Sequence, residues 1–227
     1  AAPRAFTLTG PGADRLTVNA DNVSRIIALA SGDVFIDGIA FAEGHVEDAA
    51  GAGIHVSAAA SLTLTNCAVA DCVALSSDDV YTEHGGGIYS EGPLQLINCT
   101  ISGNFAAGFG GGVYSAVWLD LGNCTISGNT ALKGDGGGIY MLNGSGDLIN
   151  CTLTANTAET GGGISKESGV LSLGNSLIAG NTALGAANDV AGIVLSFGFN
   201  MIEDSSGSEG WLPEDILEVP AEVILEA

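Results

Sequence analysis

The chain has 227 residues, with 26 Asp or Glu against 5 Lys or Arg, so its formal net charge is −21. That balance argues against nucleic acid and anionic membranes as partners, because the sequence has no basic patch to neutralise phosphates. No run is both apolar and long enough to cross a membrane, so we expect no membrane insertion. A hydrophobic content of 46% and 35 glycines instead indicate a packed core with many tight turns.

The N-terminal residues contain short strand-like runs separated by turns. Residues 6–9 and 16–18 are such runs, on either side of a Gly-Pro-Gly turn. Residues 34–41 align with residues 62–69, with Gly38 in the place of Asn66. A repeating unit therefore reaches back to about residue 25.

Two strings alternate regularly in the central part of the chain. A Gly-Gly-Gly-apolar-Tyr string begins at Gly85, Gly110 and Gly136, and a fourth copy at Gly161 has Ser in place of Tyr. The string Asn-Cys-Thr-Ile-Ser-Gly-Asn at 98–104 has related copies starting at residues 123, 150 and 175. Copies of the glycine string lie 25 or 26 residues apart, a step typical of a solenoid.

Within each repeat, apolar residues recur with a period of two, as at residues 94–97. Strands this short cannot bury a face alone, and they gain partners when equivalent strands stack in parallel about 4.8 Å apart. No capped helical pattern interrupts residues 1–202. We therefore predict an all-β solenoid with three strands and three faces per coil, in about six or seven coils over residues 1–202. The polar residues 75–84 lengthen one coil and predict an insertion loop.

Two residue types recur at fixed positions and predict structural ladders. An Asn can adopt the left-handed backbone that a sharp corner requires, and its amide can bond to the Asn of the next coil. These corner residues are Asn66, Asn98, Asn123, Asn150 and Asn175. The next residue in most repeats is a cysteine, and the set is Cys67, Cys99, Cys124 and Cys151. We expect these cysteines to stack as buried thiols, with a Cys67–Cys72 or Cys67–Cys99 disulfide as the alternative.

The glycine strings also predict an aromatic face. If the apolar residue of each string points inward, Tyr89, Tyr114 and Tyr140 point outward in one stack, with His55 below them. Such a stripe suits a sugar ring or a protein surface as a ligand. The alternative, to which we give equal weight, is that the rings stabilise the parallel sheet by stacking on one another.

Acidic residues gather near the insertion and suggest a cation site. Asp78, Asp79 and Glu83 lie in or beside it, and Asp135 precedes a later glycine string. Oxygen ligands of this kind bind calcium, so calcium is the one cofactor we consider. The alternative, a solvated acidic edge without a metal, is the one we favour, and no histidine spacing suggests zinc.

The two ends of a solenoid carry unpaired strand edges, which are templates for another chain. At the start, Phe6 and Leu8 provide an apolar edge. Residues 203–217 are predicted to form an acidic linker, and residues 218–227 a final strand containing Val219, Val223 and Leu225. That strand can fold back as a cap or pair with the next molecule.

Together the two strings resemble the right-handed parallel β-helix proteins of bacterial cell surfaces. They are similar to chlamydial polymorphic outer-membrane repeats, with residues 101–104 in the place of the Phe-x-x-Asn string. Residues 8–18 and 198–202 are similar to large secreted bacterial and archaeal β-helix proteins with C-terminal surface anchors. The resemblance covers about residues 6–205 and implies a right-handed parallel β-helix. In those proteins further coils precede the Gly-Pro-Gly stretch, so we expect the first coil here to be uncapped.

The resemblance implies a secreted, extracellular or cell-surface protein with a structural or adhesive role. We expect a non-catalytic module that assembles with itself, plausibly end to end into a filament. The alternative is a glycan-binding or polysaccharide-cleaving protein that uses the tyrosine face. The wider pectate-lyase-like superfamily includes lyases with a calcium cage and a base, and hydrolases with three clustered Asp. Because Asp135 does not share a repeat position with Asp120 or Asp147, we favour the non-catalytic interpretation and leave the enzyme question open.

Overall fold

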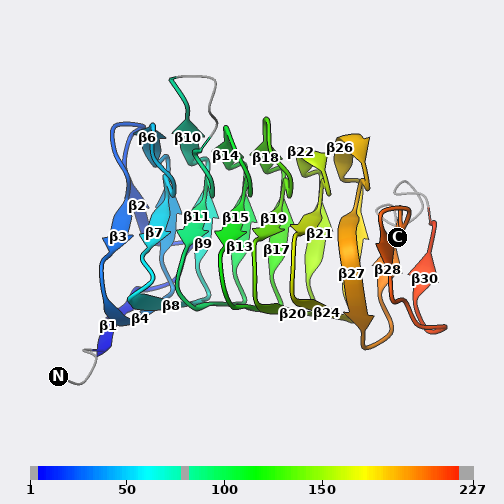
Figure 1. Ribbon diagram of the computed structural model, residues 1–227. Helices are drawn as coiled ribbons and strands as arrows, with labels where there is room; N and C mark the ends of the chain where they lie inside the picture. The colour runs from blue at the N-terminus through cyan, green and yellow to red at the C-terminus, as the bar shows by residue number, and fades with distance from the viewer. Residues whose placement is uncertain (1–4, 78–81, 220–227) are drawn as a thin grey trace.

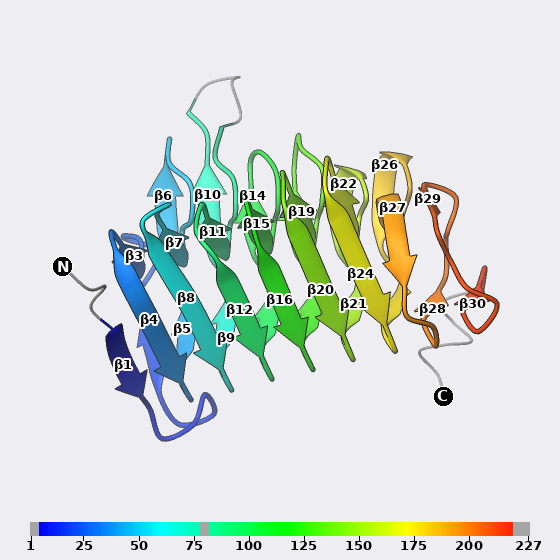
Figure 2. The same ribbon diagram turned by 60° about the horizontal axis from the view of Figure 1, so that its bottom comes forward.

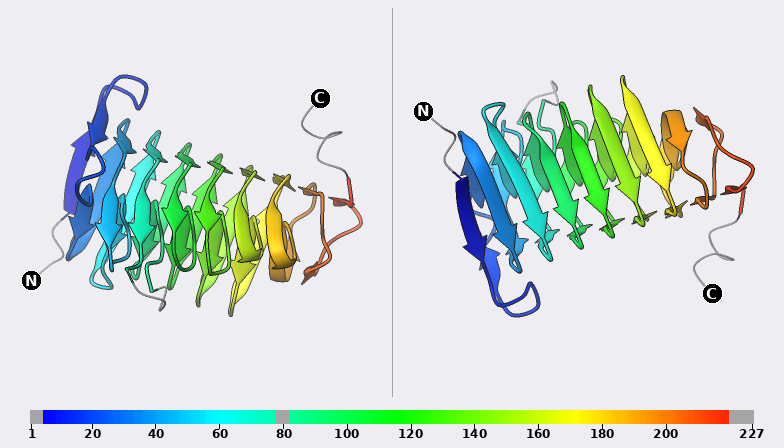
Figure 3. Two further views of the ribbon diagram at one scale, coloured as in Figure 1. Left: turned by 90° about the horizontal axis from the view of Figure 1, so that it is seen from above. Right: turned by 90° about the horizontal axis from the view of Figure 1, so that it is seen from below.

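The computed structural model describes residues 5–77 and 82–219. Its regular elements are strands throughout, and they wind into one elongated solenoid with β1 and β30 at opposite ends (Figures 1 and 3). Equivalent strands of successive coils pair in parallel and in register. The predicted all-β solenoid is therefore confirmed, and seven successive coils contribute strands to face A before the joining strand β27.

Three columns of strands form the long faces. Face A contains β1 (Ala5–Thr9), β4 (Gly32–Asp37), β8 (Ala60–Thr65), β12 (Leu94–Ile97), β16 (Leu119–Gly122), β20 (Ser145–Ile149) and β24 (Val170–Gly174), which lie side by side in Figure 2. Face B contains β2 (Thr17–Asn19), β5 (Ala40–Ala42), β9 (Ala68–Ala70), β13 (Thr100–Ser102), β17 (Thr125–Ser127), β21 (Thr152–Thr154), β25 (Leu177–Ala179), β28 (Met201–Ile202) and β30 (Ile216–Leu217). Face C contains β3 (Ile27–Leu29), β7 (Ile54–Val56), β11 (Ile88–Ser90), β15 (Val113–Ser115), β19 (Ile139–Met141) and β23 (Ile164–Lys166). The long strand β27 (Val190–Ser196) pairs with both β23 and β24 and so joins faces A and C.

A fourth, shorter column, which we call column D, follows face B in most coils and was not expected. It contains β6 (His45–Glu47), β10 (Val73–Leu75), β14 (Phe105–Ala106), β18 (Thr130–Ala131), β22 (Thr157–Thr160) and β26 (Thr182–Ala186), which lie along the top of Figure 1. A residue with left-handed backbone separates face B from column D in each of these coils, for example Gly103 with φ 65° and Gly128 with φ 64°. That bend turns the chain and starts a new ladder.

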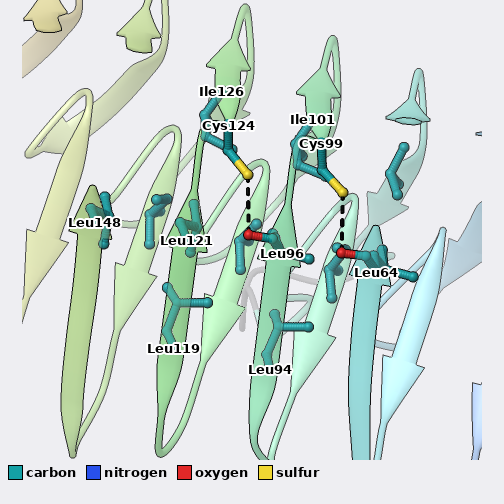
Figure 4. Close-up of a cluster of buried hydrophobic side chains, with 14 of the residues drawn as sticks. Leu64, Leu94, Leu96, Cys99, Ile101, Leu119, Leu121, Cys124, Ile126 and Leu148 are labelled. Atoms are coloured by element: carbon teal, nitrogen blue, oxygen red, sulfur yellow. Dashed lines mark hydrogen bonds between the residues drawn. The ribbon is translucent and has the colours of Figure 1, made fainter. Parts of the chain in front are cut away.

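Ladders of aliphatic side chains fill the interior. Leu64, Leu96, Leu121 and Leu148 follow one another along face A and are fully buried. Ile101 and its equivalents on face B meet them across the core (Figure 4). Because every coil buries the same positions, one Leu-to-Ala change in the interior should cost roughly 2–5 kcal/mol.

The corner asparagines form the predicted outer ladder. All five have left-handed backbone, with φ between 50° for Asn175 and 57° for Asn150. The amide nitrogen of Asn98 donates to the amide oxygen of Asn66 at 3.1 Å, and Asn123 donates to Asn98 at the same distance. These side chains lie at the surface and link each coil to the next.

The predicted cysteine column is also present. Cys67, Cys99, Cys124 and Cys151 are buried with free thiols, and so is Cys72, so neither of the alternative disulfides is formed. The Cys99 thiol donates to the carbonyl of Leu64 at 3.5 Å, and the Cys124 thiol donates to that of Leu96 at 3.3 Å (Figure 4). The thiols therefore act as small buried donors that tie one coil to the preceding one.

A second asparagine ladder, the inner ladder, runs through the interior and was not predicted. It contains Asn104, Asn129, Asn156 and Asn181, all buried. The amide oxygens of Asn129, Asn156 and Asn181 each accept both the backbone and the side-chain N–H of the Asn one coil back, as Asn129 does for Asn104 at 3.0 and 2.9 Å. The amide oxygen of Asn104 accepts the backbone N–H of Cys72 at 3.0 Å. The ladder ends at the buried carboxylate of Asp189, which accepts from Asn181 at 2.8 Å.

The triple glycines are required by close packing between these ladders. Gly110 has φ 67°, where other residues are strained. A Cβ on Gly111 would lie 2.4 Å from the carbonyl carbon of Thr130, and one on Gly112 would lie 2.6 Å from the carbonyl oxygen of Gly138. Any side chain at these two positions would push the coils apart.

Residues 203–217, which we expected to form a linker, instead fold back onto the last coil. Strand β29 (Ser208–Glu209) pairs with β27, and β30 pairs with β28. Trp211 and Leu217 pack against the hydrophobic core. The acidic composition misled the prediction, because Asp215 accepts hydrogen bonds from the backbone N–H of Asn200 at 3.0 Å and the hydroxyl of Ser196 at 2.7 Å.

Candidate functional site

The aromatic stack predicted from the glycine strings is present on the outside of face C. Tyr89, Tyr114 and Tyr140 share one register, with ring centroids 4.9 and 5.3 Å apart. His55 extends the stack, 5.2 Å from Tyr89, and Ser165 occupies the next position. The inward-pointing aliphatic residues therefore place these rings as expected.

The stack is not an open face, because a second layer covers it. His84 stacks on Tyr114 with centroids 5.0 Å apart, and Phe109 lies 4.8 Å from Tyr140. The exposed fraction of Tyr114 is 6% and that of Tyr140 is 5%. The expectation of an aromatic stripe facing solvent is thus corrected, since His84 and Phe109 take the position that a sugar ring would need.

Hydrogen bonds fix this aromatic cluster. The backbone N–H of Phe109 donates to Nδ1 of His84 at 3.0 Å, so that nitrogen carries no proton. Burial lowers the pKa of His84, which favours the neutral imidazole that this bond requires. The hydroxyl of Tyr140 donates to Glu167, and burial raises the pKa of Tyr89 to about 12. The cluster is therefore a set of neutral rings that packs like a small outer core.

The residues proposed for calcium do not come together in the described part of the chain. Asp78 and Asp79 lie outside the described residues. Glu83 is buried, with one carboxylate oxygen accepting from the hydroxyl of Thr82 at 2.9 Å and the other without a partner. Asp135 precedes another glycine string, and burial raises its pKa. Within residues 5–77 and 82–219, no three or more His, Cys, Asp or Glu side chains are arranged to bind a metal.

Two of the three aspartates considered for glycoside hydrolysis are neighbours. Asp120 and Asp147 pair in register on the outside of face A, and Gln95 donates to Asp120 at 2.8 Å. Asp135 lies instead where column D leads into face C, with its carbonyl accepting from Gly110. The described residues therefore bring together a pair here and not the triad that such a hydrolase needs.

Arg25 also has a structural position. Its guanidinium donates from Nε to the carbonyl of Gly51 at 2.9 Å and from Nη2 to that of Ala50 at 2.8 Å. Burial lowers the pKa of Arg25. A shallow hollow beside it is lined by Val23, His45 and Glu47. Through these hydrogen bonds, Arg25 holds a loop of the following coil in place.

Among the described residues, the first coil has unpaired strand edges and exposed apolar side chains. Strands β1, β2 and β3 each pair on one side only among the described residues, with β4, β5 and β7. Phe6, Leu8 and Val18 occupy the register of core residues in the next coil, yet they are 57%, 38% and 40% exposed. This N-terminal end surface contains Phe6 and Leu8, the two residues that we assigned to it from the sequence.

The opposite end is covered in part by β29 and β30. In face B, β30 pairs with β28, and its outer edge has no partner among the described residues. Phe199 is 71% exposed and Ile216 is 51% exposed nearby. Val219 is half-buried, whereas Val223 and Leu225 lie outside the described residues, so the role of residues 218–227 stays a prediction.

Comparison with known proteins agrees with this architecture. Residues 14–183, about three quarters of the chain, match the model of the family described as right handed beta helix region. Searches of curated proteins and of solved structures found no match. The described residues contain no helix that could span a membrane. With its parallel coils and three long faces, the chain belongs to the right-handed β-helix family.

Proposed function

We propose that this protein is a non-catalytic structural or adhesive module, secreted to the extracellular space or the cell surface, that associates end to end with copies of itself. The observation that carries the proposal is the N-terminal end surface, where core-register side chains are exposed beside three strand edges. Unpaired edges of this kind are templates for another chain. The resemblance of the two repeated strings to cell-surface β-helix proteins supports the location.

The polarity of face B favours a second copy as the partner. Its strands are all parallel and run from β2 at one end to β30 at the other. The outer edge of β30 in one molecule can therefore pair in parallel with the outer edge of β2 in the next. Exposed apolar residues lie at both ends, with Phe6 at one and Phe199 at the other. A head-to-tail contact of this type leaves a free end on each molecule and builds an open filament.

The tyrosine face gives less support to the alternative function. A glycan-binding or glycan-cleaving site there needs exposed rings, and Tyr114 and Tyr140 are almost fully buried beneath His84 and Phe109. The described residues also lack a three-aspartate cluster beside Asp120 and Asp147. We therefore base the proposal on the ends of the solenoid and not on its aromatic cluster.

Light scattering after size-exclusion chromatography tests the proposal with two matched variants. Phe6→Lys places a charge on the N-terminal end surface, whereas Phe35→Lys places the same charge on the side of face A, where Phe35 is 44% exposed. We expect mass to rise with concentration for the wild type and Phe35→Lys, and to stay that of one chain for Phe6→Lys. A wild type that remains a monomer at every concentration would contradict the proposal, as would equal effects of the two variants.

A further inference from the structure

Face B carries a regular array of uncharged polar side chains on its outer surface. In three successive coils the outward positions are an asparagine, a threonine and a serine or threonine. This face B array consists of Asn98, Thr100, Ser102, Asn123, Thr125, Ser127, Asn150, Thr152 and Thr154. The three strands pair in register, so equivalent side chains lie directly above one another.

The hydroxyl groups of the array are available to an outside partner. All six Ser and Thr side chains are exposed or half-exposed, and none of them has a hydrogen-bond partner within the described residues. A hydroxyl both donates and accepts, so each can join a hydrogen-bonded network in either sense. The array therefore offers six such groups on one surface.

Sheet geometry sets the spacing of these groups. Equivalent hydroxyls on neighbouring strands lie about 4.8 Å apart, and outward residues along one strand lie about 6.6 Å apart. Both margins of the array are fixed from coil to coil. The outer asparagine ladder forms one margin, with Asn150 donating to Asn123 at 3.1 Å, and the inner ladder forms the other, with Asn129 donating to Asn156 at 2.9 Å. The spacing is thus held rigidly.

The absence of charge sets the array apart from the rest of the molecule. The protein has a formal net charge of −21, yet none of the nine array positions carries a charged residue. The positions that continue the array on both sides, Ala68 and Ala70 on one and Leu177 and Ala179 on the other, are uncharged as well. Such a surface matches a neutral, hydrogen-bonding partner, because a charged partner would find no complementary group.

A soluble sugar does not fit this surface well. Sugar and small-ligand sites are concave and use aromatic side chains with a few convergent polar groups. The face B array has no aromatic residue, and its side chains stand on the outer surface of a sheet. Regular, rigid and neutral hydroxyls instead suit a partner that is itself a regular neutral lattice of hydrogen-bonding groups.

We propose that the face B array binds the surface of ice. Ice presents uncharged oxygens at fixed repeats, each able to donate and accept, and the array presents hydroxyls of the same character in a fixed two-dimensional order. Binding then rests on many weak, simultaneous hydrogen bonds, direct or through ordered water, and not on one strong contact. This inference is independent of end-to-end association, because it uses the side of the solenoid.

Ice-crystal growth in the presence of the protein tests the inference. The wild type is expected to shape growing crystals, to produce a measurable gap between freezing and melting temperatures, and to slow recrystallisation. Thr125→Lys, at the centre of the array, is expected to reduce these effects several-fold. Thr63→Lys is the matched control, because Thr63 points outward from face A and has no part in the array. Ser127→Lys serves as a second array variant if Thr125→Lys does not fold.

Four outcomes would overturn the inference. One is ice growth in the presence of the wild type that does not differ from growth in buffer. Another is a loss of activity in Thr63→Lys as large as that in Thr125→Lys. Binding to crystalline cellulose through Thr125 without any effect on ice would identify a polysaccharide as the partner. A change in oligomeric state caused by Thr125→Lys would identify the array as a contact between copies. Circular dichroism of each variant establishes that it is folded.

Discussion

The side-chain amide of Asn129 donates to the amide oxygen of Asn156, one coil further along, at 2.9 Å. The same amide donates to the carbonyl of Ile101 at 3.0 Å, and the Asn129 oxygen accepts two N–H groups from Asn104. Every polar atom of this buried side chain is thereby paired. Such a network is costly to break, because each buried polar group left without a partner lowers the free energy of unfolding by about 1–3 kcal/mol.

Asn129→Ala is therefore expected to lower the free energy of unfolding by roughly 3 kcal/mol, since it leaves several buried groups without partners. Asn123→Gly is the matched change in the outer ladder. It removes two exposed hydrogen bonds, one to Asn98 and one from Asn150, and keeps the left-handed backbone, so it should cost less than about 1 kcal/mol. Chemical denaturation of both variants measures the difference. Equal losses would show that the inner ladder has no special role.

The free cysteines give a second prediction. All five are buried and unbridged, so a thiol reagent should find almost none in the native protein and five after denaturation without reductant. Burial also raises the pKa of the Cys72 thiol to about 11, which keeps it protonated and unreactive. Three thiols in the denatured protein would mean that one disulfide exists and that the column is not as described.

His84 makes stability depend on pH in a defined direction. Because burial lowers its pKa in the folded state, the unfolded chain takes up a proton first as the pH falls through about 6.5. Stability should therefore be retained above that pH and decrease below it. His84→Gln, which keeps an acceptor for the N–H of Phe109, should reduce the loss between pH 7.5 and 5 in thermal melts. An unchanged loss would contradict the neutral, hydrogen-bonded imidazole.

Asp189 makes stability depend on pH in the opposite direction to His84. Burial raises its pKa from 3.8 to about 6, while it accepts the backbone N–H groups of Glu203 and Asp204 at 3.0 and 2.8 Å. The stability that this group contributes is present below pH 4 and is lost as the pH rises through 6. The loss amounts to roughly 3 kcal/mol. In Asp189→Asn this component should disappear, so the variant should lose less stability than the wild type between pH 4 and 7. Identical slopes in denaturation would contradict the assignment.

The repeated motifs predicted which residues occupy equivalent positions in successive coils. They did not predict how turn residues of one coil pack against the side chains of the next. Cys99 and Asn98 could be placed because a fixed step puts equivalent residues in one column. The burial of Tyr114 could not, because His84 and Phe109 come from turns of neighbouring coils. A signal existed, since His84 and Phe109 each directly precede a glycine string. The inner ladder also had a signal in the second Asn of each Asn-Cys-Thr-Ile-Ser-Gly-Asn string, which we used only for the resemblance.

The C-terminal segment shows a different limit. Composition alone indicated a linker over residues 203–217, because Asp, Glu, Ser and Gly favour solvated chain. The carboxylate of Asp189 instead accepts the backbone N–H of Glu203 in that segment, and the carboxylate of Asp215, within the segment, accepts the backbone N–H of Asn200 in the last coil. Hydrogen bonds between residues far apart in sequence leave no periodic pattern, so a reading by composition could not detect them.

Electron microscopy of the purified protein over a range of concentrations tests the proposed assembly most directly. The account predicts unbranched rods one solenoid wide, whose length grows with concentration, because each molecule offers the edges of β1, β2 and β3 at one end and that of β30 at the other. Isolated single particles at every concentration would contradict it.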